Sequence, residues 1–354
     1  MQPASFKVLA IDGGGIRGAY SAAFIDYICC HLRGTQSRSN ISMDLIGGTS
    51  TGGIIACAMA HGVSTGRLVD FYRKAGPEIF ARNSGIKVEP KRSLLRRAVR
   101  ARHNSEPLRQ ALLEVFGDET LAAVYEKSGV ALVIPVADLG KVGPSVFKTP
   151  HDRQWLNRQG HALTDGVPWA RDSKISLVDV CLATTAAPTF FEPHSIWVNG
   201  AERRYADGGL TANSPVLVAL LEAMDLADPD QDIHVVSIGT CPIKESYSAP
   251  HGKGGFLAWG KLAAPYAIDC SAELQLQMAI RVARHLSTEG RNIHVDRLVA
   301  SALPINIAKE IEMDRAKPSL VEALIAHGHA DAEKLLSDLN GGRCDRRVRD
   351  FFEN

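Results

Sequence analysis

Residues 42–60 read SMDLIGGTSTGGIIACAMA, and this stretch decides the fold. A largely apolar run is followed by the turn GTSTG at 48–52 and then by a second apolar run typical of a helix. Strand, sharp turn and helix in this order place Ser50 at the apex of the turn. Such a turn strains the backbone of the serine and needs small residues two positions away, here Gly48 and Gly52. The stretch therefore predicts a nucleophile elbow with Ser50 as the nucleophile.

A second glycine cluster lies upstream, where the apolar run 6–11 continues into DGGGIRG at 12–18. Consecutive glycines at a helix N-terminus expose backbone N–H groups, and these favour negative charge together with the helix dipole. In acyl transfer that charge is the oxyanion of the tetrahedral intermediate. We therefore predict an oxyanion hole formed by three consecutive glycines, Gly13, Gly14 and Gly15. Arg17 would stabilise this loop or add positive potential.

The same cluster matches a dinucleotide-binding pattern. Gly13, Gly15 and Gly18 satisfy G-x-G-x-x-G between a predicted strand and a predicted helix. That site also needs an acidic residue at the tip of the second strand, where it binds the ribose hydroxyls. Here Asp44 lies within the second apolar run, and Ser50 follows its tip. The spacing therefore favours acyl transfer over dinucleotide binding.

A serine hydroxyl is almost un-ionised at neutral pH and needs a base within hydrogen-bond reach. Among the carboxylates, Asp207 is distinguished by its position between a short strand-like run, 203–206, and the glycines Gly208 and Gly209. An Asp-Gly-Gly turn is also a common surface feature. We predict Asp207 as the base.

Three short motifs follow one another along the chain: DGGGIRG at 12–18, GTSTG at 48–52 and DGG at 207–209. In this order they resemble the patatin-like phospholipase family, and the resemblance covers residues 5–240, including 184–191 and 209–215 beside the aspartate. It implies a Ser50–Asp207 dyad, with no metal and no cofactor. It also implies hydrolysis of the carboxyl esters of membrane phospholipids or lysophospholipids.

The dyad requires surroundings that raise the pKa of Asp207. An aspartate is a weak base in water, where its pKa is about 3.9. A largely dry pocket would have to raise the pKa of Asp207 before it could take a proton from Ser50 in the transition state.

Two other functions remain open at this level. The first is an esterase of the α/β-hydrolase type that acts on soluble esters; such an enzyme uses Ser, Asp or Glu, and then His. Six histidines follow Asp207: His234, His251, His285, His294, His327 and His329. Of these, His234 is typical of a satisfied histidine in a strand, and only His251 lies in a glycine-flanked loop. The second alternative is a non-catalytic module whose glycine-rich loop holds an anion.

Strand-like runs alternate with helical stretches along the chain: 6–11, 42–46, 130–136, 195–198, 203–206 and 233–238. This predicts an α/β protein. The resemblance specifies the three-layer α/β/α arrangement, with a mostly parallel central sheet. We expect a single domain, 1–354, with a motif-bearing core at 5–240 and a helical extension at 250–354. In the extension, 272–286 and 318–339 are typical of amphipathic helices.

Composition favours an intracellular protein. The seven cysteines show no C-x-x-C spacing, which is typical of buried thiols in a reducing compartment. No signal peptide is evident at the N-terminus, and no apolar run approaches the ~18 residues of a membrane span. We expect a cytoplasmic protein that makes peripheral contact with the inner face of the membrane.

The formal net charge is +1, but one segment is strongly basic: Lys87, Lys91, Arg92, Arg96, Arg97, Arg100 and Arg102. This basic run suits anionic lipid headgroups or an acidic ligand. It lacks interleaved aromatic residues, which argues against nucleic-acid binding. The chain also resembles bacterial patatin-like proteins, some of which are antiphage effectors switched on by cyclic nucleotides, and this implies a cyclic nucleotide activator. Residues beyond 240 are candidates for homo-oligomer formation.

Overall fold

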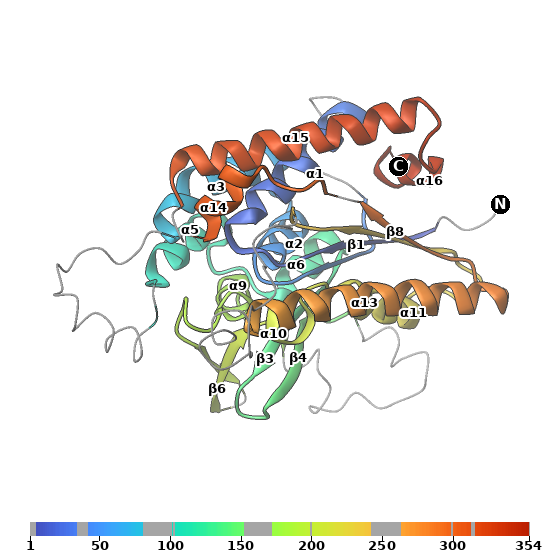
Figure 1. Cartoon of the computed structure of the whole chain (residues 1–354). Coiled ribbons are helices and arrows are strands. Elements are labelled where there is room, and N and C mark those ends of the chain that lie inside the picture. Colours follow the sequence, from blue (N-terminus) through green and yellow to red (C-terminus); the bar gives the residue numbers. More distant parts are fainter. Residues whose placement is uncertain are drawn as a thin grey trace, which may run out of the picture.

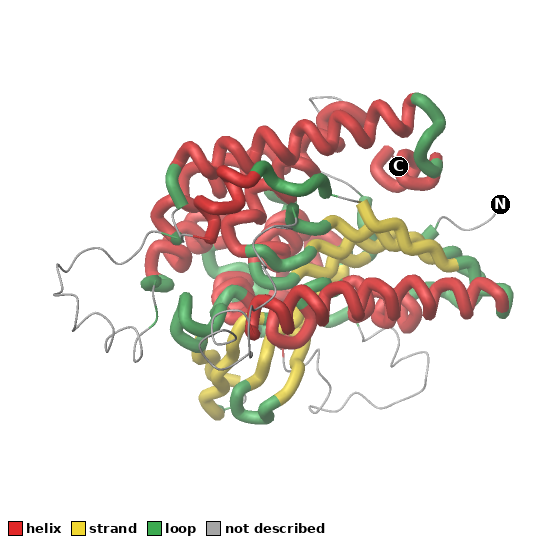
Figure 2. Tube along the Cα trace, in the orientation of Figure 1, coloured by secondary structure: helices red, strands yellow, loops and turns green. Residues whose placement is uncertain are grey.

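The structure is a computed structural model that describes residues 5–33, 42–80, 101, 103–151, 172–198, 200–241, 263–298, 300–312 and 316–353. An eight-stranded sheet lies between two helical layers (Figure 1). One layer contains α1 (Gly18–Arg33), α3 (Thr65–Ile79) and α15 (Pro318–Asn340), and the other contains α11 (Val216–Leu226) and α13 (Ala263–Thr288). Figure 2 shows these helices on either side of the strands. The predicted three-layer α/β/α fold is confirmed.

Five strands are parallel and adjacent: β3 (Ala131–Asp138), β2 (Leu45–Gly48), β1 (Phe6–Ile11), β7 (Ile233–Ile238) and β8 (Ile293–Leu298). Three strands complete the sheet with antiparallel pairing: β4 (Gly143–Lys148), β5 (His194–Val198) and β6 (Ala201–Asp207). The six predicted strands are present, with ends displaced by a few residues. The C-terminal extension is not only helical, because it contributes β8. Its middle residues are only partly buried, so the sequence lacks the apolar run of a central strand.

The remaining described helices are α2 (Thr51–His61), α5 (Glu106–Phe116), α6 (Leu121–Ser128), α9 (Leu177–Thr184), α10 (Gly209–Ala212), α14 (Ile305–Glu312) and α16 (Arg346–Glu353). The two amphipathic helices expected beyond residue 240 correspond to α13 and α15. Among the described residues, no helix is long and apolar enough to cross a bilayer. The basic run from Lys87 to Arg102 and the loop containing His251 lie outside the described residues.

Side chains of the central strands alternate between two hydrophobic cores. In β1, Leu9 and Ile11 belong to the core that includes α1 and α15, whereas Val8 and Ala10 belong to the core that includes α11 and α13. All four are fully buried. A strand covered by helices on both faces needs a continuous apolar run, which explains why β1 was recognisable in the sequence.

Two strands meet end to end along β3. Gly47 of β2 and Lys148 of β4 both pair with Val133, so β2 and β4 lie on opposite sides of β3. Asp207 of β6 pairs with Val136 of β3. Because β4 pairs with the same residue, β6 and β4 also lie on opposite sides of β3. Therefore β2 and β6 share one side of β3, and they approach each other from opposite directions. Their carboxyl ends meet within three residues of β3, which brings the residues after β2 to the end of β6.

Candidate active site

Ser50 lies between the last residue of β2 and the first residue of α2, in a strained conformation with φ 53° and ψ −121°. A positive φ is uncommon for a residue other than glycine. A Cβ atom added to Gly48 would lie 2.2 Å from the carbonyl oxygen of Gly52. One added to Gly52 would lie 2.2 Å from the carbonyl oxygen of Ile11. Both positions of the predicted elbow thus require glycine, because backbone atoms fill the space on either side of the serine.

The Ser50 hydroxyl donates a hydrogen bond to Asp207, with 2.7 Å between Oγ and Oδ2. The other carboxylate oxygen, Oδ1, accepts a bond from the Gly209 N–H at 2.6 Å. Ser50 is 8% exposed and Asp207 is 7% exposed. Burial raises the pKa of Asp207 to about 6, against the smaller lowering effect of these two hydrogen bonds. The carboxylate is therefore a stronger base than an aspartate in water.

Thr184, at the end of α9, forms hydrogen bonds to both the Ser50 turn and the turn that follows Asp207. Its hydroxyl donates to the carbonyl of Pro135 at 2.7 Å and accepts the Ser50 N–H at 3.0 Å. Its own carbonyl accepts the Gly208 N–H at 3.1 Å. Gly208 fits closely here, because an added Cβ would lie 2.1 Å from the Pro135 carbonyl oxygen. Sequence reasoning placed Thr184 in the resemblance but gave it no role, since its partners are 49 and 134 residues away.

The glycine-rich loop has its peptide groups held in fixed orientations. The Gly13 carbonyl accepts a bond from the Thr240 hydroxyl at 3.3 Å, and the Gly14 carbonyl accepts one from Arg17 Nε at 3.3 Å. In a trans peptide the N–H of the next residue points away from the carbonyl, so both bonds orient the N–H groups of Gly14 and Gly15. Neither of these N–H groups has a partner among the described residues.

Gly13 differs from its two neighbours. Its N–H donates to the carbonyl of Asn213 at 2.9 Å, so it is not available to a bound anion. An added Cβ would lie 2.3 Å from Asn213 Oδ1 and 3.4 Å from Ser50 Cβ. Of the three predicted donors, only Gly14 and Gly15 present unengaged N–H groups, and Gly13 provides close contact between the loop and the serine.

Residues distant in sequence hold this loop in place. Arg17 donates through Nη1 to the carbonyl of Cys241 at 3.0 Å, which fits the loop-stabilising role expected of it. Arg297 in β8 forms an ion pair with Asp12 at 2.6 Å and donates to the Ser237 hydroxyl at 2.7 Å. Sequence reasoning missed Arg297 and Thr240. No local motif marks them, because their relation to the loop arises only when β7 and β8 join the sheet.

The alternatives have less support from the geometry. Among the described residues, no histidine is hydrogen-bonded to Ser50, and His234 is satisfied by Asp296 with 2.8 Å between Nε2 and Oδ2. Asp44 was expected within the second strand, but it precedes β2 and accepts the Lys7 N–H at 2.7 Å. It therefore lies at the opposite end of β2 from the glycine-rich loop, where it could not bind a ribose.

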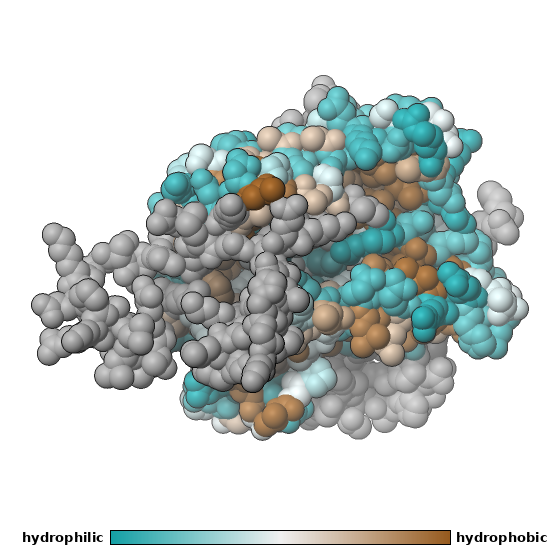
Figure 3. All heavy atoms as spheres, viewed as in Figure 1, coloured by the Kyte–Doolittle hydropathy of each residue, from teal (hydrophilic) through white to brown (hydrophobic). Residues whose placement is uncertain are grey.

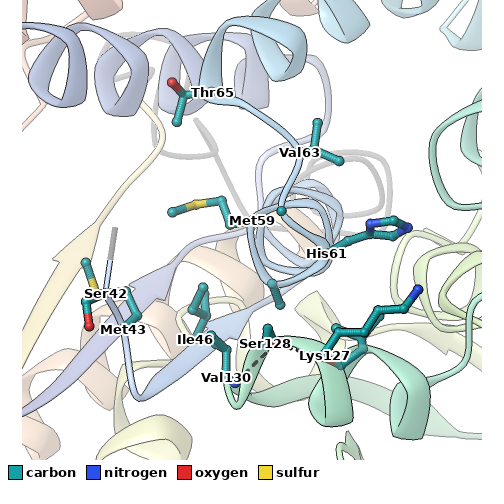
Figure 4. Close-up of a pocket in the computed structure, with 13 residues that line it drawn as sticks. Ser42, Met43, Ile46, Met59, His61, Val63, Thr65, Lys127, Ser128 and Val130 are labelled. Carbon is teal, nitrogen blue, oxygen red and sulfur yellow. Dashed lines mark hydrogen bonds between the residues drawn. The ribbon is translucent and has the colours of Figure 1, made fainter. Parts of the chain in front are cut away.

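A cavity of about 470 Å³ lies beside the C-terminal end of α2 (Figure 4). Ile46, Met59 and Val130 are among its lining residues. Because α2 is about 16 Å long at 1.5 Å per residue, this cavity is separated from Ser50 by the length of the helix. It does not belong to the site at the serine. In the part of the chain that the structure describes, no cluster of three His, Cys, Asp or Glu side chains is arranged to hold a metal ion.

The sheet, the strained serine after β2 and the buried aspartate at the end of β6 define an α/β protein with a serine at a strand-to-helix turn. Residues 9–220 match the family model described as patatin-like phospholipase. The chain belongs to the patatin-like phospholipase family, as the three motifs predicted. It is accordingly a carboxylic ester hydrolase.

The chain is similar to bacterial and plant members of this family. It is 30% identical to a cGAMP-activated phospholipase of Vibrio cholerae serotype O1, over 98% of this chain and 94% of that protein. A cGAMP-activated phospholipase of Escherichia coli strain TW11681 is 27% identical over 98% of this chain and 92% of its own length. Patatin-like protein 1 of Arabidopsis thaliana is 31% identical over 71% of this chain and 63% of its own length.

Proposed function

We propose that this protein hydrolyses the acyl esters of membrane phospholipids through a Ser50–Asp207 dyad. Asp207 Oδ2 takes the proton from Ser50 Oγ as the oxygen attacks the ester carbonyl. The N–H groups of Gly14 and Gly15 then bind the oxyanion. As this intermediate collapses, the protonated Asp207 gives its proton to the departing oxygen, so that the alcohol of the lipid leaves and an acyl group remains on Ser50. Asp207 next deprotonates a water molecule that releases the fatty acid and restores the serine.

The observation that carries this proposal is the 2.7 Å bond from Ser50 to a buried aspartate whose pKa is raised to about 6. A general base works best when its pKa is close to the operating pH. The carboxylate is also held in place by Gly209 and does not have to reorient during the reaction. Gly48 and Gly52 support the dyad by letting the backbone turn sharply at Ser50.

A lipid substrate is supported by the family and by aromatic side chains beside the loop. A Cβ added to Gly15 would lie 3.8 Å from Phe80 Cε1, so the Phe80 ring adjoins the oxyanion donors. The ring of Phe191 lies 6.5 Å from that of Phe80. An acyl chain entering beside these rings would be removed from water, which is the favourable part of binding a lipid tail.

Control by a cyclic nucleotide is the second part of the proposal. Two relatives that align with nearly the whole chain carry the name cGAMP-activated phospholipase. The basic run at 87–102 would suit the phosphates of such an activator. We further propose that the protein acts in the cytoplasm, as an antiviral effector at the inner face of the membrane.

The test is the release of free fatty acid from mixed phospholipid vesicles by wild-type protein and by Ser50→Ala, each with and without cGAMP. We expect release by the wild type alone, and faster release with cGAMP. Equal release by the folded Ser50→Ala protein would contradict the dyad. Release that is independent of cGAMP would contradict gating by this ligand and leave the hydrolase assignment intact.

A further inference from the structure

Two β-hairpins project from one corner of the sheet, at the lower edge of Figure 1. One is β3–β4 with the turn 139–142, and the other is β5–β6. We propose that the tips of these hairpins form the surface through which the protein docks on a phospholipid bilayer. This inference rests on the proposed phospholipase function and specifies where that enzyme contacts its substrate surface.

The tips expose large apolar side chains. Val142 is 90% exposed, Trp197 is 73% exposed and Leu139 is 42% exposed. Figure 3 shows hydrophobic atoms at this lowest point of the molecule. Tryptophan is enriched at membrane interfaces, because its amphipathic ring is stable at the level of the headgroups.

Strand pairing places two of these side chains, Trp197 and Leu139, on one face. Trp197 pairs with Glu202, which shares a face with Arg204 two residues further along β6. The Leu139 N–H donates to the Arg204 carbonyl at 2.9 Å, which continues the register of β3 with β6. Trp197, Arg204 and Leu139 therefore lie on the same solvent-exposed face of the sheet.

The turn that carries Val142 is ordered, and its conformation is costly. The Asp138 carboxylate accepts the N–H groups of Gly140 and Lys141 at 2.9 and 3.1 Å. Val142 has a φ of 51°. A β-branched residue at positive φ is a clear outlier, and glycine or asparagine would fit better. Because 90% of the Val142 side chain is exposed, little packing within the molecule offsets this strain. A contact of the side chain with something outside the molecule would explain why a valine occupies this position.

Charge and shape favour a bilayer as the partner of the hairpin tips. Lys141 and Arg204 are exposed and form no ion pair with other described residues, so they can bind lipid phosphates. Arg203 pairs with the buried Asp138 at 3.5 Å and belongs to the hairpin itself. Three apolar side chains on projecting tips do not provide the roughly 800 Å² per partner of a stable protein interface. They match shallow insertion into a headgroup layer.

The position of the tips fits the reaction. The carboxyl ends of β2 and β3 point toward the same edge of the sheet, and Ser50 follows β2 at that edge. Asp207 pairs with Val136, and β3 continues for two more residues to Asp138, a distance of about 7 Å at 3.3 Å per residue, before the turn 139–142. The tips thus extend past the level of the dyad at the edge of the sheet where Ser50 lies.

The test compares vesicle binding with turnover of a soluble ester. Val142→Asp/Trp197→Asp is measured beside Leu274→Asp, a matched change at a side chain that is 58% exposed on α13. Binding to vesicles of phosphatidylethanolamine and phosphatidylglycerol is measured by flotation in the Ser50→Ala background, where no lipid is consumed. We expect the double variant to bind at least about tenfold more weakly, and the Leu274 variant to bind as the parent does.

With Ser50 intact, the double variant should hydrolyse vesicle lipid at least about tenfold more slowly and p-nitrophenyl butyrate within twofold of the wild type. Vesicle binding equal to the parent, or a parent that binds no vesicles, would overturn the docking surface. An equal loss on the soluble ester would also overturn it, since the tips would then act on the dyad. Failure of the proposed function would be seen separately, as a wild type that is inactive on both substrates even with cGAMP present.

Trp197→Phe and Lys141→Gln/Arg204→Gln refine the result. The phenylalanine variant should still bind, because it keeps an aromatic ring, while losing any blue shift of tryptophan fluorescence that arises from Trp197. The glutamine variant should weaken binding to anionic vesicles only. An unchanged fluorescence shift in Trp197→Phe would place the inserted tryptophan elsewhere and contradict the proposal.

Discussion

Arg297 and Asp12 form an ion pair in which 2.6 Å separates Nη2 from Oδ2, although the two residues are 285 positions apart in the chain. Asp12 follows β1 and begins the glycine-rich loop, while Arg297 belongs to β8 at the edge of the parallel part of the sheet. The pair links the loop proposed to hold the oxyanion to a strand outside residues 9–220, the part that matches the family model. Residues beyond that match are thus part of the support of the site.

Replacing Arg297 by methionine should lower the free energy of unfolding by about 2–4 kcal/mol, because it leaves the buried Asp12 carboxylate without its partner. The loop would shift, and kcat should fall by about tenfold or more with little change in KM. Urea unfolding and soluble-ester kinetics measure the two effects. Arg297→Met/Asp12→Asn should recover part of the stability, since no lone charge remains. Additive losses in the double variant would contradict a coupled pair.

The pH dependence of hydrolysis should follow the ionisation of Asp207. The carboxylate must be ionised to accept the serine proton, and its pKa is raised to about 6 by burial. We therefore expect kcat for a soluble ester to rise as pH increases through about 6 and then to level off. Ser50→Ala provides the background rate at each pH. A midpoint near 4, the usual value for an aspartate, would show that burial does not tune this group.

Asp207→Asn should make the protein more stable above pH 6 while it abolishes hydrolysis. The pKa of Asp207 is higher in the folded state than its ordinary value of 3.8, so the folded state favours the protonated form. The destabilisation is absent below pH 3.8, develops as pH rises to about 6 and is complete above that value. Its full size is about 3 kcal/mol at most. Thermal unfolding of both proteins at pH 4 and pH 8 tests this, and an equal difference at both values would refute it.

The strained backbone of Ser50 should be visible in a comparison of two inactive variants. At φ 53° and ψ −121°, glycine is favoured over alanine, so Ser50→Gly should be about 1 kcal/mol more stable than Ser50→Ala. The same pair at Ser271, inside helix α13, should give the opposite sign by about 1 kcal/mol. Chemical unfolding measures both pairs. Equal signs at the two positions would mean that Ser50 carries no stored strain.

Gly208→Ala should prevent the dyad from forming, because the added Cβ would lie 2.1 Å from the Pro135 carbonyl oxygen. Backbone atoms on both sides must then move, and we expect a loss of at least about 2 kcal/mol in unfolding free energy together with activity. Gly143→Ala is the matched control, since the Cβ would meet only the Lys141 carbonyl oxygen at 3.8 Å. A Gly208→Ala protein with wild-type kinetics would contradict the close packing of β3 against the aspartate turn.

Much of the local structure could be predicted from the sequence. The strands β1 and β7 are short apolar runs buried on both faces. The glycines at 48 and 52 indicate a turn in which there is no space for a larger side chain at either position. Strand β4 escaped prediction because it is mostly half-buried and exposed, and β8 because only Ile293 and Leu298 in it are buried. Neither strand shows the apolar run or regular alternation on which such predictions depend.

The residue types of the dyad and of the glycine-rich loop are determined by the sequence alone, because a strained turn and an exposed row of N–H groups each require a particular local chemistry. Only the tertiary structure decides that Ser50 contacts Asp207, because β2 and β6 must first pair with β3 so that their carboxyl ends lie next to each other. It also decides that Gly13 bonds to Asn213, that Thr240 and Arg297 hold the loop, and that Asp207 is dry enough for its pKa to reach about 6. Burial and long-range pairing arise only when distant segments pack together, and no local pattern records them.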